Sequence, residues 1–349
     1  MSKYVILRKR HLSYLFDKKA LWVITILFVV LMFAALVSMG MGQMAIHPLD
    51  VLKALFGYGT EMERLVVTSF RLPRIMLAIL AGAALAVSGA ILQGIIRNPL
   101  ASPDIIGITG GASVAVVTFF TLFSDRSNAL TVSINWLPLA AFLGAFLIGF
   151  LVYILAWKEG VSPLRLVLIG IGLAAAMKAL TTLMMILGPI YRATEANIWI
   201  TGSVHGTNWR EVLTLLPWVL AMGVLALVRT RHLNVQELGD EVGKGVGSAI
   251  QKERLILLTL STALAGGAVA FAGGIGFVGL MAPHMARRLV GSAYGVLIPV
   301  SALMGGLIVL LADLAARTLF APLEVPAGVF TAAIGAPYFI YLLFRQRQH

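Results

Sequence analysis

The chain has 349 residues, of which 59% are hydrophobic and only 12% are charged. A soluble protein of this length needs far more polar surface to cover its core, so no sizeable soluble domain is expected. The net charge of +12 does not indicate nucleic-acid binding, because the basic residues lie at the ends of apolar runs and not on one solvated face. Since the chain has no cysteine, disulfides, thiolate metal sites and thiol catalysis are excluded.

The first element is a basic segment, residues 1–20, that precedes an apolar stretch of about 20 residues. This stretch is longer than the apolar core of a signal peptide, and no clear cleavage site of small residues follows it. We therefore expect a cytoplasmic N-terminal segment and a retained first membrane span.

Apolar runs then recur along the whole chain, each long enough to cross about 30 Å of hydrocarbon as a helix. They lack the alternation of apolar and polar positions that membrane strands show. Their approximate ranges are 21–42, 75–96, 105–123, 136–157, 166–187, 211–228, 255–286, 294–312 and 326–344.

The run 255–286 is too long for one span, and its glycines at 266–267 and in AGGIGFVG (272–279) favour a turn. We interpret it as two short helices that return to the starting side, which gives ten spans. With the N-terminus inside, this count places most Lys and Arg residues at the inner ends, as the positive-inside rule requires. The sequence thus predicts an all-α polytopic membrane protein with about ten transmembrane helices, both termini cytoplasmic, and one membrane domain over 21–344.

The second run carries small residues on one helical face, at Gly82, Ala86, Gly89 and Ala90. Such a face lets another helix approach closely, either within the chain or across a dimer contact. Gln93 continues this face toward the inner end. The following NPLASPD (98–104) contains two prolines and therefore ends the helix and turns the chain at the cytoplasmic surface.

Three arginines lie on the outer side, which should be poor in basic residues. Arg71 and Arg74 precede the second span, and Arg317 lies at the outer end of the ninth. Each could anchor a helix at the interface by snorkelling. Together they also form a site suited to carboxylates. Asp313, four residues before Arg317, is placed to orient that arginine through a helical pair.

Residues 229–254 form the most polar stretch of the second half. Within it, VQELGDEVGKGVG carries apolar residues at helical spacing together with four glycines. This pattern predicts two short helices joined by a tight bend, which would present a small amphipathic knob to a partner.

One basic residue, Lys178, falls near the middle of the fifth span. Ionisable groups inside spans are expensive and usually face protein or water. Neutral burial, pairing with a polar group of another helix, and a positive spot on a cavity wall favouring anionic substrates all remain open.

Three stretches, 71–112, 233–247 and 272–343, together closely resemble the FecCD family, the permeases that import iron-siderophore complexes and cobalamin. They include RLPRIMLAIL, RNPLASPDIIGITGGA, LNVQELGDEVGKGVG and GFVGLMAPHMARR. The resemblance implies a type II ABC importer permease in the bacterial inner membrane. It also implies three kinds of partner: two ATPase subunits, an extracytoplasmic binding protein or lipoprotein, and a second permease that is the same or a related chain. Ferric siderophores are the expected substrates, with cobalamin or haem as alternatives.

The resemblance further implies roles for individual residues. Those that would receive glutamates of the binding protein are Arg71, Arg74 and Arg317. Those expected to contact the ATPase or shape the knob in 229–254 are Glu237, Leu238, Gly239 and Gly243. Those assigned to the translocation pathway or its gates are Gln93, Asn98, Leu100, Ser162, Pro163 and Lys178. Pro163 replaces a small hydroxyl residue of the family, and Lys178 a small or neutral one, so Lys178 bears on substrate preference.

Nothing in the sequence indicates catalysis. Gly274, Gly276 and Gly279 match GxGxxG but lie outside any βαβ unit, and residues 239–245 lack the spacing and hydroxyl residue of a phosphate loop. The six histidines make no paired-ligand spacing, so no metal site or cofactor is expected. An ion-coupled secondary transporter, the alternative of a different class, normally needs carboxylates within the membrane, and only Asp313 lies inside a predicted span.

Overall fold

The computed structural model describes residues 4–9, 12–125, 129–189 and 192–346. Within this part of the chain, eight helices are long and apolar enough to cross a membrane. They are α1 (Lys18–Gly40), α4 (Leu72–Ile96), α6 (Leu137–Ala156), α7 (Pro163–Leu187), α9 (Trp209–Val228), α12 (Ile250–Ala272), α14 (Tyr294–Thr318) and α15 (Ala327–Gln346). Two shorter helices, α5 (Ile108–Phe123) and α13 (Val278–Val290), complete the ten that the sequence predicted.

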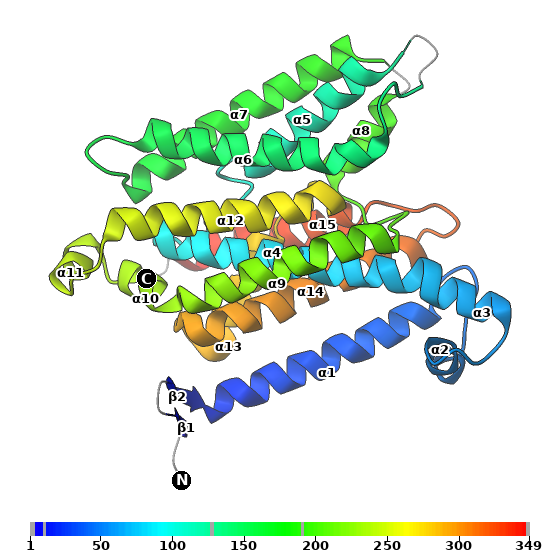
Figure 1. Ribbon diagram of the computed structural model, residues 1–349, viewed down its shortest axis with the longest axis horizontal. Helices are drawn as coiled ribbons and strands as arrows, with labels where there is room; N and C mark the ends of the chain where they lie inside the picture. Colours follow the sequence, from blue (N-terminus) through cyan, green and yellow to red (C-terminus); the bar gives the residue numbers. More distant parts are fainter. Residues whose placement is uncertain (1–3, 10–11, 126–128, 190–191, 347–349) are drawn as a thin grey trace.

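The remaining elements lie at the ends of these helices. At the end where the chain is expected to face outward are α2 (Pro48–Leu55), α3 (Glu61–Leu65), the π-helical turn η1 (Val66–Arg71), the 3-10 turn η2 (Ile134–Trp136) and α8 (Ala193–Thr201). At the opposite end are α10 (Thr230–Glu237) and α11 (Asp240–Gly245) (Figure 1). The basic N-terminal segment also contains an antiparallel hairpin, β1 (Tyr4–Lys9) and β2 (Leu12–Asp17), which the sequence analysis did not predict.

Two helices begin or end further out than the apolar runs indicated. The second span is continuous with α3 and η1, so its helical rod covers residues 61–96, and Thr60 and Glu63 cap its start reciprocally. Helix α14 likewise continues to Thr318. All three outer arginines therefore lie within helices and not in the loops before or after them.

The prediction of two short helices in 255–286 was half right. Helix α12 is a full-length span of 23 residues, and only α13, with 13 residues, is short. Gly266 and Gly267 lie inside α12, where a Cβ on Gly267 would stand 2.7 Å from the Trp218 ring of α9, so they serve close packing. The turn lies at 273–277, within the second glycine stretch that the sequence indicated, where Gly273 has φ +67°.

Helix α4 is the centre of the fold and packs against α9, α12, α13 and α14. Its small residues permit direct backbone contact: a Cβ on Gly82 would lie 2.2 Å from the Gly305 carbonyl oxygen, and one on Gly89 would lie 1.7 Å from that of Gly279. This face is therefore used for packing within the chain. Helices α5, α6 and α7 form a layer on one side of this core, and α1 lies on the opposite side (Figure 1).

Candidate functional site

The outer arginines are brought together, but the loop between α1 and α2 covers two of them. Arg71 is 9% exposed and donates hydrogen bonds to the Met39 carbonyl oxygen, at 2.5 Å, and to that of Met44. A Cβ on Gly42 would lie 2.9 Å from Nη2 of Arg71 and 3.4 Å from Nη1 of Arg317, so the loop backbone runs between the two guanidinium groups.

Arg317 binds the same loop from the side of α14. It is 8% exposed and donates to the Met41 carbonyl oxygen at 2.7 Å, to Ser38 Oγ at 2.6 Å and to the Ser38 carbonyl oxygen. Arg71 and Arg317 thus supply donors to backbone carbonyls that the end of α1 leaves unpaired. Their first role in this conformation is to fix loop 38–46.

Arg74 has carboxylate partners instead. Its Nη2 lies 2.8 Å from Oδ1 of Asp313, and its Nε donates to both oxygens of that carboxylate, at 2.9 and 3.1 Å. Asp313 is 1% exposed and also lies 3.7 Å from Nε of Arg317, so it stands between the two arginines. The predicted pair of Asp313 and Arg317 is present, but the bidentate contact to Arg74 is the stronger one.

A second carboxylate completes the cluster. Glu324, in the loop between α14 and α15, accepts a hydrogen bond from Nη1 of Arg74 at 2.9 Å and contacts Nδ1 of His205. Partial burial raises the pKa of Glu324, but Arg74 and His205 outweigh this effect and lower it below its ordinary value. We define Arg71, Arg74, Asp313, Arg317 and Glu324 as the outer cluster; it contains three guanidinium groups and two carboxylates.

At the opposite end, α10 and α11 form the predicted pair of short helices. Gly239 makes the bend with φ +108°, and a Cβ on Gly243 would lie 2.3 Å from Cδ1 of Ile250, so both glycines determine the shape of the pair. Leu238, Val242 and Val246 are exposed, Leu238 by 66%. This knob, residues 230–246, presents apolar side chains at the end of the molecule opposite the outer cluster (Figure 1).

Ion pairs join the knob to the membrane helices. Glu237 lies 2.8 Å from Nη1 of Arg287 in α13. Oδ1 of Asp240 accepts from Arg97, at the end of α4, at 2.5 Å, and from the fully buried Arg254 of α12 at 2.8 Å. The knob is therefore connected by ion pairs to the ends of α4, α12 and α13.

The residues assigned to gates lie at helix ends. Oδ1 of Asn98 accepts from the Leu100 N–H at 2.9 Å, which stabilises the turn after α4. The side chain of Leu100 packs against the cluster of Leu280, Met281 and Leu342. Ser162 caps α7 by accepting from the Arg165 N–H at 3.3 Å, and Pro163 is the first residue of that helix.

The other two residues assigned to the pathway, Gln93 and Lys178, differ in their exposure. Gln93 is 2% exposed and donates to the Leu280 carbonyl oxygen at 3.4 Å, so it is packed between α4 and α13 and does not face an open pathway here. Lys178 lies on an exposed face of α7, which excludes burial within the chain. It follows Ala174, a residue of the cavity described next, by one helical turn.

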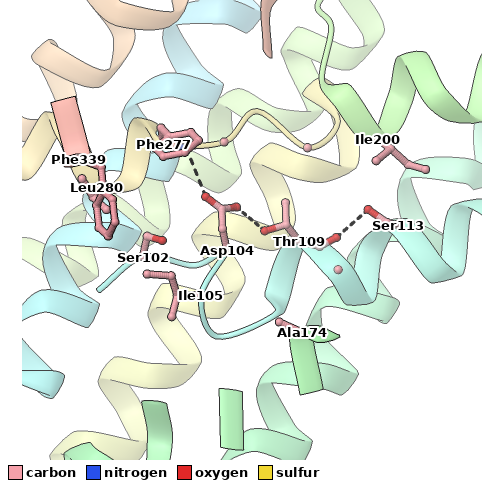
Figure 2. Close-up of a pocket in the computed structure, with 13 residues that line it drawn as sticks. Ser102, Asp104, Ile105, Thr109, Ser113, Ala174, Ile200, Phe277, Leu280 and Phe339 are labelled. Atoms are coloured by element: carbon pink, nitrogen blue, oxygen red, sulfur yellow. Dashed lines mark hydrogen bonds between the residues drawn. The ribbon is translucent and has the colours of Figure 1, made fainter. Parts of the chain in front are cut away.

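A cavity of about 520 Å³ lies between the start of α5, the turn 273–277, α7 and α15. Its polar side chains are Ser102, Asp104, Thr109 and Ser113, whereas Phe277, Leu280 and Phe339 make its apolar wall (Figure 2). Asp104 accepts from the Thr109 hydroxyl and, at 3.4 Å, from the Phe277 N–H. The sequence analysis did not single out Asp104, although an acidic residue directly after a proline-rich helix end was a usable signal.

The comparisons with known proteins decide the family. The FecCD transport family matches residues 30–345, nearly the whole chain. The chain belongs to this family. It is therefore a multi-pass membrane permease.

Relatives of this FecCD protein cover almost its full length. It is 58% identical to the "Probable siderophore transport system permease protein YfhA" of Bacillus subtilis, over 95% of this chain and 96% of that one. It is 44% identical to the iron(3+)-hydroxamate import permease FhuG of the same organism, over 94% and 98%. A solved structure described as an inward-facing metal-chelate type ABC transporter matches with a TM-score of 0.81 and 31% identity, over 93% of this chain and 99% of that one.

Proposed function

We propose that this FecCD permease is the membrane subunit of an ATP-driven importer that moves ferric siderophore complexes from an extracytoplasmic binding protein into the cytoplasm. The names of the relatives at 58% and 44% identity support a siderophore as cargo. A third relative, the achromobactin permease CbrC of Dickeya dadantii at 47% identity, supports the same class. The knob carries the proposal, because exposed apolar residues joined by ion pairs to three membrane helices suit a surface driven by a partner.

On the cytoplasmic side, that partner is a pair of ATPase subunits. Leu238 and the exposed valines of the knob supply the apolar contact, and Gly239 and Gly243 keep the two short helices in shape. Glu237 acts through Arg287 of α13, so it transmits movement and does not need to touch the ATPase. Residues 229–254 thereby couple closure of the ATPases to the membrane helices.

On the outer side, the binding protein docks through the outer cluster. Arg74 is the arginine within direct reach, because its partner Glu324 lies in a loop and is partly exposed. A carboxylate of the binding protein replaces Glu324 on Arg74 by a simple exchange of partners. Arg71 and Arg317 bind loop 38–46. They become available to further carboxylates when their hydrogen bonds to the Met44 and Met41 carbonyl oxygens break.

Residues 21–344 form the permease domain, and a second permease, identical or related, completes the pathway. The cavity beside Asp104 then becomes part of a wall shared by two subunits, with Asn98, Leu100, Ser162 and Pro163 at its cytoplasmic end. Lys178 adds a positive charge near this wall, which favours anionic chelates.

Cobalamin is the second candidate cargo, because the cobalamin import permease BtuC of Halobacterium salinarum is 40% identical over 81% of this chain and 74% of that one. The test is uptake into proteoliposomes that contain the permease, its ATPase and its binding protein. We expect ATP-dependent uptake of an iron-labelled ferric trihydroxamate and little uptake of cobalamin. The reverse preference would assign cobalamin as cargo.

A further inference from the structure

The segment 97–104, between α4 and α5, is attached at both ends to parts of the molecule that the knob moves. At its start, Arg97 lies 2.5 Å from Asp240 of α11. At its end, Asp104 accepts from the Phe277 N–H, 173 positions away, at 3.4 Å. The proposed gate residues Asn98 and Leu100 lie between these two attachments.

Asp104 also stands where two helices begin. Thr109, whose hydroxyl donates to Asp104, is in the first turn of α5, and Phe277 directly precedes α13 with φ +66°. Helix N-termini carry partial positive charge, so a carboxylate between them is stabilised. Among the described residues no salt bridge to Asp104 is found, and its hydrogen-bond donors are the Thr109 hydroxyl and the Phe277 N–H.

The C-terminal end of α13 contacts the knob. Arg287, in the last turn of α13, lies 2.8 Å from Glu237 of α10. Contacts therefore run from α10 through α13 and Asp104 into the segment 97–104, and from there through Arg97 back to α11. Because α10 and α11 are adjacent parts of the knob, both ends of the segment are tied to one moving unit.

We propose that Asp104 is a positioning residue for transport: it locks the end of the segment 97–104 to the start of α13, so that the knob moves the whole gate segment and not only its first residue. This inference rests on the proposed function. It assigns a role to a carboxylate in the cavity wall that needs no contact with the cargo.

The geometry allows the role of Asp104 in transport to be tested with variants that still fold. Asp104 is partly exposed to the cavity, whose volume admits water, so Thr109 and Phe277 can bind water when the carboxylate is removed. Asp104→Asn keeps the size of the side chain and one acceptor oxygen, so it can still accept from the Phe277 N–H, whereas Asp104→Ala removes both acceptors. Thr214 provides the control, because it lies on α9 away from this cavity and donates within its own helix, to the Arg210 carbonyl oxygen at 2.7 Å.

The experiment measures cargo transported per ATP hydrolysed by the complete importer in proteoliposomes, with a ferric trihydroxamate as cargo. Hydrogen bonds to a charged group are worth enough to change an equilibrium by about tenfold. We expect Asp104→Ala to lower the ratio by about tenfold, and Asp104→Asn, which can still accept from the Phe277 N–H, to lower it less. Docking of the binding protein should stay at the wild-type level, and Thr214→Ala should retain the wild-type ratio.

A second readout follows the gate directly. Since the chain has no cysteine, Leu100→Cys introduces a unique thiol. We expect Asp104→Ala to raise the alkylation rate of this thiol from the cytoplasmic side by about tenfold without nucleotide, because the segment is released at one end.

The inference is overturned if the ratio and the alkylation rate both stay at the wild-type level. It is also overturned if transport and ATP hydrolysis fall in parallel, or if Thr214→Ala reproduces the defect, since both results indicate a purely structural role. Absence of ATP-dependent uptake by the wild-type complex would instead contradict the proposed function.

Discussion

The side chains of Arg74 and Asp313 meet at 2.8 Å although 239 positions separate them in the sequence. This contact joins α4 to α14 at the outer end and leaves Asp313 1% exposed between two guanidinium groups. Because a buried charge that loses its partner is strongly destabilising, this pair sets both the stability of the outer end and the position of Arg74 for docking.

Removing the buried carboxylate should destabilise the permease. We expect Asp313→Ala to lower the unfolding free energy by about 3 kcal/mol, because Arg74 and Arg317 lose the carboxylate between them. Thermal unfolding in detergent measures this. Asp50→Ala is the control, since Asp50 forms an exposed pair with Lys53 on α2 and should leave Tm unchanged. Equal Tm values for both variants would contradict the structural role of Asp313.

Neutralising Glu324 should strengthen docking. Glu324→Gln removes the internal carboxylate that competes for Arg74, so the affinity for the binding protein should rise by about fivefold. Titration of the permease with labelled binding protein measures this change. Glu61→Gln, an exposed carboxylate in the first turn of α3 at the same end, should leave the affinity unchanged. A weaker affinity in Glu324→Gln would show that Glu324 helps to bind the partner.

The same carboxylate gives a pH prediction. Because the folded-state pKa of Glu324 is lowered, its ion pairs contribute stability above the ordinary pKa of a glutamate, about 4.3, and lose it as the pH falls through the lower folded value. Glu324 should therefore compete with the carboxylates of the binding protein for Arg74 from pH 7 down to about 5. Wild-type affinity that approaches that of Glu324→Gln within this range would contradict the assignment.

The backbone contacts of α4 should not tolerate a side chain. We expect Gly89→Ala to destabilise the protein by about 2 kcal/mol or more, because the added Cβ would lie 1.7 Å from the Gly279 carbonyl oxygen. Gly172→Ala in α7 is the matched control, since its Cβ meets no atom within 4 Å. Comparable losses of Tm in both variants would mean that α4 and α13 are not in direct contact.

How much of the fold and of the candidate site the sequence predicts depends on how far apart the contacting residues lie in the chain. Apolar runs located the spans, and glycine spacing in 235–247 predicted the two knob helices. The outer ends of α4 and α14 were missed, because the hydrophobicity of the sequence falls at the charged residues Arg71, Arg74 and Arg317. The pairing of Arg74 with Asp313 and the bond of Asp104 to Phe277 link distant segments, and one sequence carries no signal for such contacts. The packing of Gln93 against α13 was not predicted, because helical spacing gives a face but not what covers it.

The knob should be required for ATPase binding and dispensable for folding. Leu238 is 66% exposed, so Leu238→Asp should weaken the binding of the ATPase by more than tenfold while Tm stays unchanged. Leu49→Asp places the same change on a residue that is 60% exposed on α2, at the outer end, and should leave ATPase binding intact. Pull-down of the ATPase by the purified permease compares the two variants.

The central claim is that an ATPase drives this permease through the knob. Its most direct test is iron-chelate uptake by proteoliposomes in which ATP and an ion gradient are supplied separately. We predict uptake with ATP, the ATPase and the binding protein together, and loss of that uptake in Leu238→Asp. Uptake by the permease alone under a proton or sodium gradient would contradict the claim.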